Sequence, residues 1–275
     1  MNINTILVHV ADDDECAKRL KVAKALARDY KAHLTAVFIP TPFNRRSVGR
    51  AASATLLAEM TKSARERLLA AKAEFESVCK DWKISHSWHE EEGDHLSILE
   101  DHARAADLMI VSQSHVVNLE DRFRLLLSEE LVMISGVPVL VVPEAWEPDA
   151  IGETVLIAWK STRECVRAVR DSLAILQQAK QVTVLTVGSA EQTGRLPADQ
   201  VINYLNRHNV KATHRRDYDE DTDVGNVILK VAADESSDLI VMGAYGRKRT
   251  WRSMLLGRAT RVVSRQTTVP TIFSH

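Results

Sequence analysis

The stretch "TILVHVADDDECA" at residues 5–17 is written a second time as "TVLIAWKSTRECV" at residues 154–166. In both copies a threonine begins an apolar run, a polar break follows, and the pair Glu-Cys comes at the same spacing. Such a run followed by a polar break is typical of a buried strand that leads into a helix. The recurrence predicts that the chain contains two copies of one structural unit.

Three further pairs of segments support the repeat and keep the same order in each half. They are "HLTAVFIP" (33–40) with "QVTVLTVG" (181–188), "ADLMIVSQSH" (106–115) with "SDLIVMGAYG" (237–246), and "GVPVLVVP" (136–143) with "TVPTIFSH" (268–275). The segment "PEAWEPDAIG" (143–152) lies between the copies and has the proline and acid content of a linker. We therefore expect two domains, at residues 1–147 and 148–275.

Short β-branched runs alternate with longer helical patterns throughout each half. Strands are expected at 3–10, 33–39, 84–89, 107–112 and 138–142, and again at 154–159, 181–187, 210–216, 238–242 and 269–273. Helices are expected at 12–30, 46–80, 94–105 and 118–135, and again at 162–179, 197–208, 224–235 and 250–265. Continuous apolar strands separated by helices indicate parallel strands buried on both faces, so the predicted class is doubly wound α/β.

The composition excludes several classes of protein. With 275 residues, 45% hydrophobic and 27% charged residues, the chain has the profile of a globular two-domain protein. A net charge of −1 gives no field that would attract nucleic acid or an acidic membrane, and neither partner is expected. No apolar run approaches the roughly 20 residues that span a bilayer. Three scattered cysteines and no secretory leader predict a reduced, cytoplasmic protein.

The glycine-rich segment "GAYGRKRTWRSMLLGRAT" (243–260) follows one of the predicted strands. In open parallel sheets ligands bind beyond the carboxyl ends of the strands. Glycine lets backbone approach a ligand, and the N–H groups at the start of the next helix attract anions. The pattern predicts a phosphate site, although turn glycines beside a solvated basic face would look the same.

The sequence as a whole resembles a tandem universal stress protein. The resemblance rests on "ILVHV" and "VLIAW", on "GDHLSILEDHARAADLMIV" (93–111), on the Gly-x-x-Gly-to-Gly stretch after "DLIVM", and on "VPVLVV" with "VPTIF". It implies two Rossmann-like domains, each with a five-stranded parallel sheet of order 3-2-1-4-5, whose last strands pair with each other. It also implies a role in stress survival and, in many members, binding of an adenine nucleotide.

The second half departs from the pattern of the nucleotide-binding members. Ten residues separate Gly246 from Gly257 where nine are expected, and Arg258 stands where those members have a hydroxyl. Lys160 stands where they have an aspartate, and Val187 is expected to offer main-chain groups to the base. The residues expected to line the site are Trp159, Lys160, Val187, Met242, Gly243, Gly246, Arg247, Lys248, Gly257, Arg258, Ala259 and Thr260.

The first half lacks the features that would hold a phosphate. Ser112 and His115 replace the first two glycines, no third glycine follows, and Ala11 takes the position of the aspartate. We expect this half to act as a structural or regulatory partner without nucleotide.

The primary hypothesis is therefore a stress-response sensor that binds an adenine nucleotide, such as ATP, or a related phosphate ligand in its second half. No catalytic residues are assigned, because the nucleophile-elbow and Walker patterns are absent, and ATP hydrolysis would at most be slow. Mg²⁺ is expected only with bound ATP, and the histidines show no metal-ligand spacing. The alternative is a nucleotide-free interaction protein in which Lys160 and Arg258 block the pocket. Its surfaces would be the strands near 137–142 and 269–273, paired within one chain as a pseudo-dimer or between chains of a homodimer, with protein partners unknown.

Overall fold

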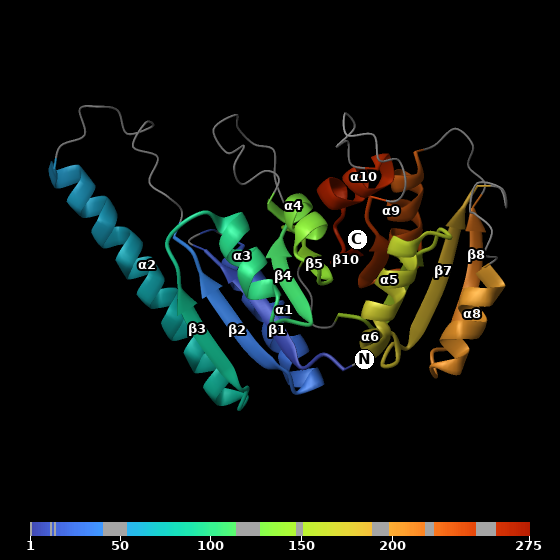
Figure 1. Ribbon diagram of the computed structural model, residues 1–275, viewed down its shortest axis with the longest axis horizontal. Helices are drawn as coiled ribbons and strands as arrows, with labels where there is room; N and C mark the ends of the chain where they lie inside the picture. The colour runs from blue at the N-terminus through green and yellow to red at the C-terminus, as the bar shows by residue number, and fades with distance from the viewer. Residues whose placement is uncertain are drawn as a thin grey trace.

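The computed structural model describes ten strands that form one sheet (Figure 1). The described residues are 2–11, 13, 15–40, 54–113, 127–146, 151–188, 198–217, 223–245 and 257–275. The strands of the first half are β1 (Thr5–Val10), β2 (His33–Phe38), β3 (His86–Glu90), β4 (Leu108–Ser112) and β5 (Val139–Val142). Those of the second half are β6 (Thr154–Ala158), β7 (Gln181–Val187), β8 (Ala212–Asp217), β9 (Leu239–Gly243) and β10 (Thr271–Ser274).

The order of the strands repeats the same pattern in both halves. Across the sheet it is β3-β2-β1-β4-β5-β10-β9-β6-β7-β8, so each half has the order 3-2-1-4-5 counted along its own chain. All pairs within a half are parallel. The predicted α/β class and strand order are thereby confirmed.

The two halves join edge to edge at the seam between β5 and β10. These strands pair antiparallel, with Ile272 opposite Leu140 at the centre. The prediction that the last strands pair across the halves is therefore correct, and their pairing lies within one chain. Because this pairing turns two five-stranded sheets into one continuous sheet, β3 and β8 are its outer strands.

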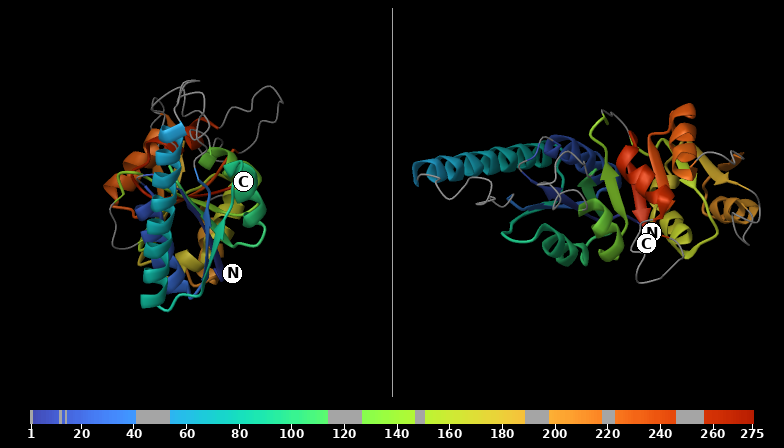
Figure 2. Two further views of the ribbon diagram at one scale, coloured as in Figure 1. Left: turned by 90° about the vertical axis from the view of Figure 1, so that its left-hand side faces the viewer. Right: turned by 90° about the horizontal axis from the view of Figure 1, so that it is seen from above.

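Helices cover both faces of the sheet (Figure 2). One face carries α1 (Cys16–Tyr30), α2 (Ala54–Asp81), α5 (Arg163–Asp171), α6 (Leu173–Leu176) and α8 (Ala198–Arg207), packed on one apolar cluster. The other carries α3 (His95–Ala103), α4 (Leu127–Ile134), α9 (Val224–Asp234) and α10 (Arg258–Gln266), packed on a second cluster. Strand residues alternate between the clusters, as with Ile6 and Leu7, because successive side chains of a strand face opposite ways.

An aspartate at the start of the fourth strand of each half fastens the beginning of the first strand. The Asp107 carboxylate accepts hydrogen bonds from the main-chain N–H of Asn4 and Thr5, at 2.8 and 2.9 Å. The equivalent Asp238 accepts three, from Gly152, Glu153 and Thr154, at 2.9–3.1 Å. The repeated Asp-Leu of the sequence is thus a structural clamp in both copies.

One helix differs from the sequence-based expectation. The helix expected over 162–179 is divided at Ser172, whose φ of −90° and ψ of 0° end α5 and start the single turn of α6. The division turns Leu173–Leu176 into the apolar cluster, where all four residues are buried.

Helix α2 has 28 residues, and its beginning extends past the outer strand β3 (Figures 1 and 2). Among the described helices, none combines the length and apolarity that a membrane crossing requires.

Candidate functional site

The candidate site of the second half lies at the carboxyl ends of β6, β7 and β9. Parallel pairing in register brings Ala158, Leu185 and Met242 side by side near these ends. Trp159 and Lys160 follow β6 directly; the Trp159 side chain is buried and Lys160 is exposed. The predicted residues of these three strands are therefore brought to one edge of the sheet.

Trp159 has an unusual polar environment at this edge. Its main-chain N–H donates to Leu185 O at 2.8 Å, which extends the ladder by one residue. Its indole Nε1 is buried and has no hydrogen-bond partner among the residues that the structure describes. Buried donors are normally satisfied, so an acceptor on a bound molecule or a water molecule would fit this atom.

Gly243, the last residue of β9, allows a helix to approach the strand. A Cβ at this position would lie 2.4 Å from Cys165 N and 2.5 Å from Glu164 C, both in the first turn of α5. That turn is capped by Thr162, whose hydroxyl accepts from Cys165 N at 3.4 Å. Close packing of α5 on β9 is sufficient reason for this glycine, whatever its role toward a ligand.

The start of α10 lies beside the end of β9. Thr260, in the first turn of α10, is buried, and its Oγ1 accepts from Tyr245 N at 3.5 Å. Gly257 takes the N-cap position, with open space around it: the nearest atom to a Cβ there would be Thr260 Oγ1, at 3.7 Å. Gly257 offers no side chain to cap this helix, and a helix N-terminus next to a strand end is an arrangement that attracts anions.

Arg258, which the sequence placed on the phosphate, makes a contact with α9. Its Nε pairs with Asp223 Oδ2, and its side chain remains 87% exposed while that of Asp223 is 9% exposed. Asp223 is also the N-cap of α9, accepting from Gly225 N at 2.9 Å. The pairing uses one nitrogen of the guanidinium and leaves most of the group in solvent.

Several predicted site residues can be placed only in part. Gly246, Arg247 and Lys248 lie outside the described residues. Met242 is buried in the second apolar cluster, so only its main chain borders the strand end. Val187 ends β7, and Ala259 lies in the first turn of α10.

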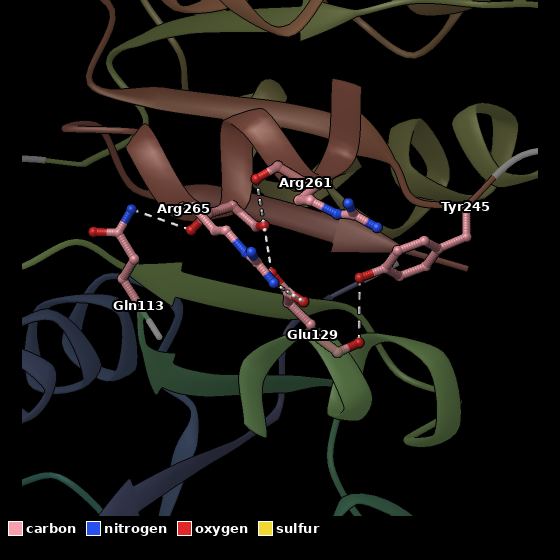
Figure 3. Close-up of polar contacts among 6 residues, drawn as sticks. Gln113, Glu129, Tyr245, Arg261 and Arg265 are labelled. Carbon is pink, nitrogen blue, oxygen red and sulfur yellow. Dashed lines mark hydrogen bonds and ion pairs between the residues drawn. The ribbon is translucent and has the colours of Figure 1, made fainter. Parts of the chain in front are cut away.

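Polar residues from both halves meet at the seam beside this site (Figure 3). The Glu129 carboxylate, on α4 of the first half, pairs with Arg265 of α10 through Nε at 2.8 Å and Nη2 at 3.2 Å. The Tyr245 hydroxyl donates to Glu129 O at 3.3 Å (Figure 3). Burial, and next to it the Glu129 charge, raises the pKa of Tyr245, so this hydroxyl stays a donor. No pattern in the sequence indicated these contacts.

The corresponding strand end of the first half is occupied by Arg19. This α1 side chain is 1% exposed and donates from Nε to His9 O at 2.8 Å, from Nη1 to Ser112 Oγ at 2.5 Å and from Nη2 to Asp13 Oδ2 at 2.9 Å. Ser112 ends β4 as Gly243 ends β9. His115 lies outside the described residues, so the predicted absence of a nucleotide in this half stays a prediction.

The described histidines and cysteines make no metal cluster. His9 and His95 contact each other through ring nitrogens at 3.2 Å, and His89 lies 5.0 Å from His102, centroid to centroid. In the part of the chain that the structure describes, no three His, Cys, Asp or Glu side chains are grouped so as to hold a metal ion.

Comparison with known proteins assigns the fold and sequence to one family. The model of the universal stress protein family matches twice, at residues 2–143 and 153–275, and the chain belongs to this family. The repeat is thus a tandem pair of universal stress units.

Solved structures agree over nearly the whole chain. A universal stress protein from Archaeoglobus fulgidus shares 15% identity over 99% of this chain and 96% of its own, with a TM-score of 0.74. A Pseudomonas aeruginosa protein of unknown function shares 15% identity over 99% of this chain and 92% of its own, with a TM-score of 0.60. At such identities the likeness shows the fold alone. No curated protein matches the chain by sequence.

Proposed function

We propose that this universal stress protein is a sensor whose second half binds an adenine nucleotide or a related phosphate ligand. The observation that carries the proposal is the meeting of the end of β9 with the N-terminus of α10, held together by Tyr245 N and Thr260 Oγ1. The N–H groups of that helix start face a strand end, where open α/β sheets bind ligands.

The described residues divide into two groups of roles in this proposal. Gly257, Ala259 and Thr260 supply main-chain N–H groups to the phosphate, and Arg258 adds charge from the solvent side. Trp159, Lys160 and the main chain of Val187 border the place for the base and ribose. The unpartnered indole N–H of Trp159 fits such a ligand. Gly246, Arg247 and Lys248 belong to the proposed phosphate loop by their sequence alone.

The choice of an adenine nucleotide comes from the family. A member from Arabidopsis thaliana was solved with AMP bound, and another universal stress protein with cAMP. If ATP is the ligand, Mg²⁺ accompanies its phosphates. Binding without fast hydrolysis fits a sensor, because no catalytic base is assigned at the site. The three cysteines are free and buried, as in a reducing compartment, and we place the protein in the cytoplasm.

Titration calorimetry with ATP, ADP and AMP tests the proposal on protein that native mass spectrometry shows to be free of ligand. Binding of at least one nucleotide is expected, weakened by Arg258→Ala and unchanged by Arg170→Ala, an exposed arginine on α5 that serves as the matched control. The absence of heat with all three nucleotides would overturn the nucleotide proposal.

The interaction alternative has two observations in its favour. Arg258 is already paired with Asp223, and Lys160 places a cation where nucleotide-binding members carry an acid. The strands first considered as its surfaces, β5 and β10, pair with each other, so further assembly through the sheet would use β3 or β8. Light scattering across a concentration series measures whether the chain forms a homodimer.

A further inference from the structure

We propose that Glu129, which the first half contributes, is a positioning residue for Tyr245 and α10, which border the candidate ligand site of the second half, so that the two halves form one binding unit. The inference rests on the proposed function for its ligand-dependent part, but the contacts themselves exist within the chain alone. Glu129 lies in the first turn of α4, across the seam from α10.

The first contact reaches the loop itself. Tyr245 lies between Gly243 and Gly246 and has a φ of +62°, a left-handed conformation that a bulky residue adopts only when its surroundings hold it. Its hydroxyl donates to Glu129 O at 3.3 Å, and its ring lies 6.0 Å from that of His275, centroid to centroid. The backbone conformation of Tyr245 is therefore tied to the main chain of α4.

The second contact reaches the helix on the other side of the site. Glu129 is 2% exposed, and both of its carboxylate oxygens bind Arg265 of α10. Ser264 Oγ lies 3.2 Å from Glu129 Oε1. These residues share α10 with Thr260, little more than one turn earlier, where the phosphate would bind. A buried bidentate pair fixes distance and angle, because planar guanidinium and carboxylate groups fit in few orientations.

Both walls of the candidate site thus converge on one residue of the other half. Gln113, which follows β4, adds a third link by donating from Nε2 to Ser264 O and Thr267 O, each at 3.1 Å. Figure 3 shows Gln113, Glu129, Tyr245 and Arg265 converging between α4 and α10. A ligand that shifts Tyr245 or the start of α10 must act on α4, and by linkage α4 must act on ligand affinity.

Two pairs of variants test the proposal by ADP affinity. Tyr245→Phe removes the hydroxyl bond to Glu129 O and keeps the ring, with Tyr204→Phe on α8 as its control. Glu129→Gln removes the charge that holds Arg265, with the exposed neighbour Glu130→Gln as its control. We expect about fivefold weaker binding for Tyr245→Phe and about tenfold for Glu129→Gln, against changes below about twofold in the controls.

Hydrogen exchange separates positioning from a merely structural role. In the wild type, ADP is expected to slow amide exchange in α4 (residues 127–134), and in Tyr245→Phe this ligand-dependent protection should be lost. Nucleotide binding with unchanged affinities in both variants, or without protection of α4, would overturn the inference while leaving the proposed function intact.

If the wild type binds no nucleotide, hydrogen exchange without ligand still tests the positioning role of Glu129. In that case the proposed function fails, and exchange in α10 is compared between Glu129→Gln and Glu130→Gln without ligand. Faster exchange in Glu129→Gln alone supports the positioning role. Equal exchange in the two variants overturns it.

Discussion

The two halves differ in how a helix packs against the end of their fourth strand. At the end of β4 the first half places a buried arginine, Arg19, whose guanidinium donates to Ser112 and to Asp13. At the end of β9 the second half has Gly243, and the backbone of α5 comes so close that no Cβ fits. Ala168 occupies the helix position of Arg19, 149 residues later, as Cys165 matches Cys16. One small residue in the helix and one in the strand replace a buried cation and its hydroxyl partner.

The two halves also differ in how far a cation near this edge of the sheet is exposed to solvent. In the first half the cation is 1% exposed and fully engaged with the protein's own groups. In the second half Arg258 is 87% exposed and held through one nitrogen. A buried, satisfied guanidinium leaves no group for an external anion, whereas an exposed one at a helix start does. The scaffold is common to both, and the placement of one cation distinguishes them.

The largest expected effect is on the buried cation. Arg19→Ala should lower the free energy of unfolding by about 3 kcal/mol, because it leaves Asp13, Ser112 and the His9 carbonyl without their donor. Urea unfolding measures this loss. The control is Arg28→Ala, which removes an exposed ion pair on the same helix and should lower the free energy of unfolding by less than about 0.5 kcal/mol. Equal stabilities of the two variants would contradict the account of the first half.

A somewhat smaller effect is expected from a methyl group in the second half. Gly243→Ala should destabilise by about 2 kcal/mol, because its Cβ meets α5 backbone that cannot rotate away. Gly257→Ala is the matched control, with its nearest neighbour at 3.7 Å, and should change stability by less than about 1 kcal/mol. If Gly243→Ala proves as stable as Gly257→Ala in thermal unfolding, the packing reason for Gly243 is wrong.

A smaller effect is expected on ligand affinity when Asp223, the partner of the exposed Arg258, is changed. Asp223→Asn keeps a side chain that caps α9 but removes the charge that holds Arg258. ADP affinity should rise about threefold, a modest change because the Arg258 side chain is mostly in solvent. Asp234→Asn, at the other end of α9, should leave the affinity unchanged. Calorimetry that finds lower affinity for Asp223→Asn would show that Asp223 orients Arg258 and does not compete for it.

The smallest expected effect is a pH dependence of stability that arises from Asp171, in a third pair of equivalent positions. Asp171 on α5 matches the buried Val22 of α1, and burial raises the pKa of its carboxyl despite the Ser274 hydroxyl bond and Arg167. A raised pKa means that the folded state holds its proton more tightly, so this group's contribution to stability falls as pH rises from about 3.9 to the raised value. Asp171→Asn should remove this pH dependence, which amounts to less than about 1 kcal/mol of the free energy of unfolding. Parallel pH profiles of the wild type and the variant in urea would contradict the assignment.

Periodicity and repetition were sufficient to predict the architecture. Apolar runs such as 33–39 and 238–242 became β2 and β9 within a residue, because strands buried on both faces leave a continuous apolar signature. The pattern of two copies predicted two α/β units, whereas the strand order of each half and the seam between β5 and β10 followed from the family resemblance. Division of a helix at Ser172 was not predictable, since no proline or glycine marks it.

The site could be predicted only in outline. Glycine and arginine spacing identified the start of α10, but not that Asp223 holds Arg258, because the pairing depends on how α9 packs on α10. Arg19 was missed, although it lies on the apolar stripe of α1, four residues before Ala23 and seven before Leu26. Its partners include Ser112, 93 residues away, and no local pattern announces such a contact. Glu129 was missed for the same reason.

The seam has a consequence for how the chain assembles. Matching Pro138 with Pro270 makes Glu129 the counterpart of Arg261 and Met133 the counterpart of Arg265. Two copies of the first half, brought together with two-fold symmetry, would offer Glu129 only a methionine, and two copies of the second half would bring arginines against arginines. The favourable pairing of Glu129 with Arg265 arises only when unlike halves meet. Covalent fusion guarantees that meeting at a fixed one-to-one ratio. Two first halves would lack this ion pair, and two second halves would be disfavoured by like charges.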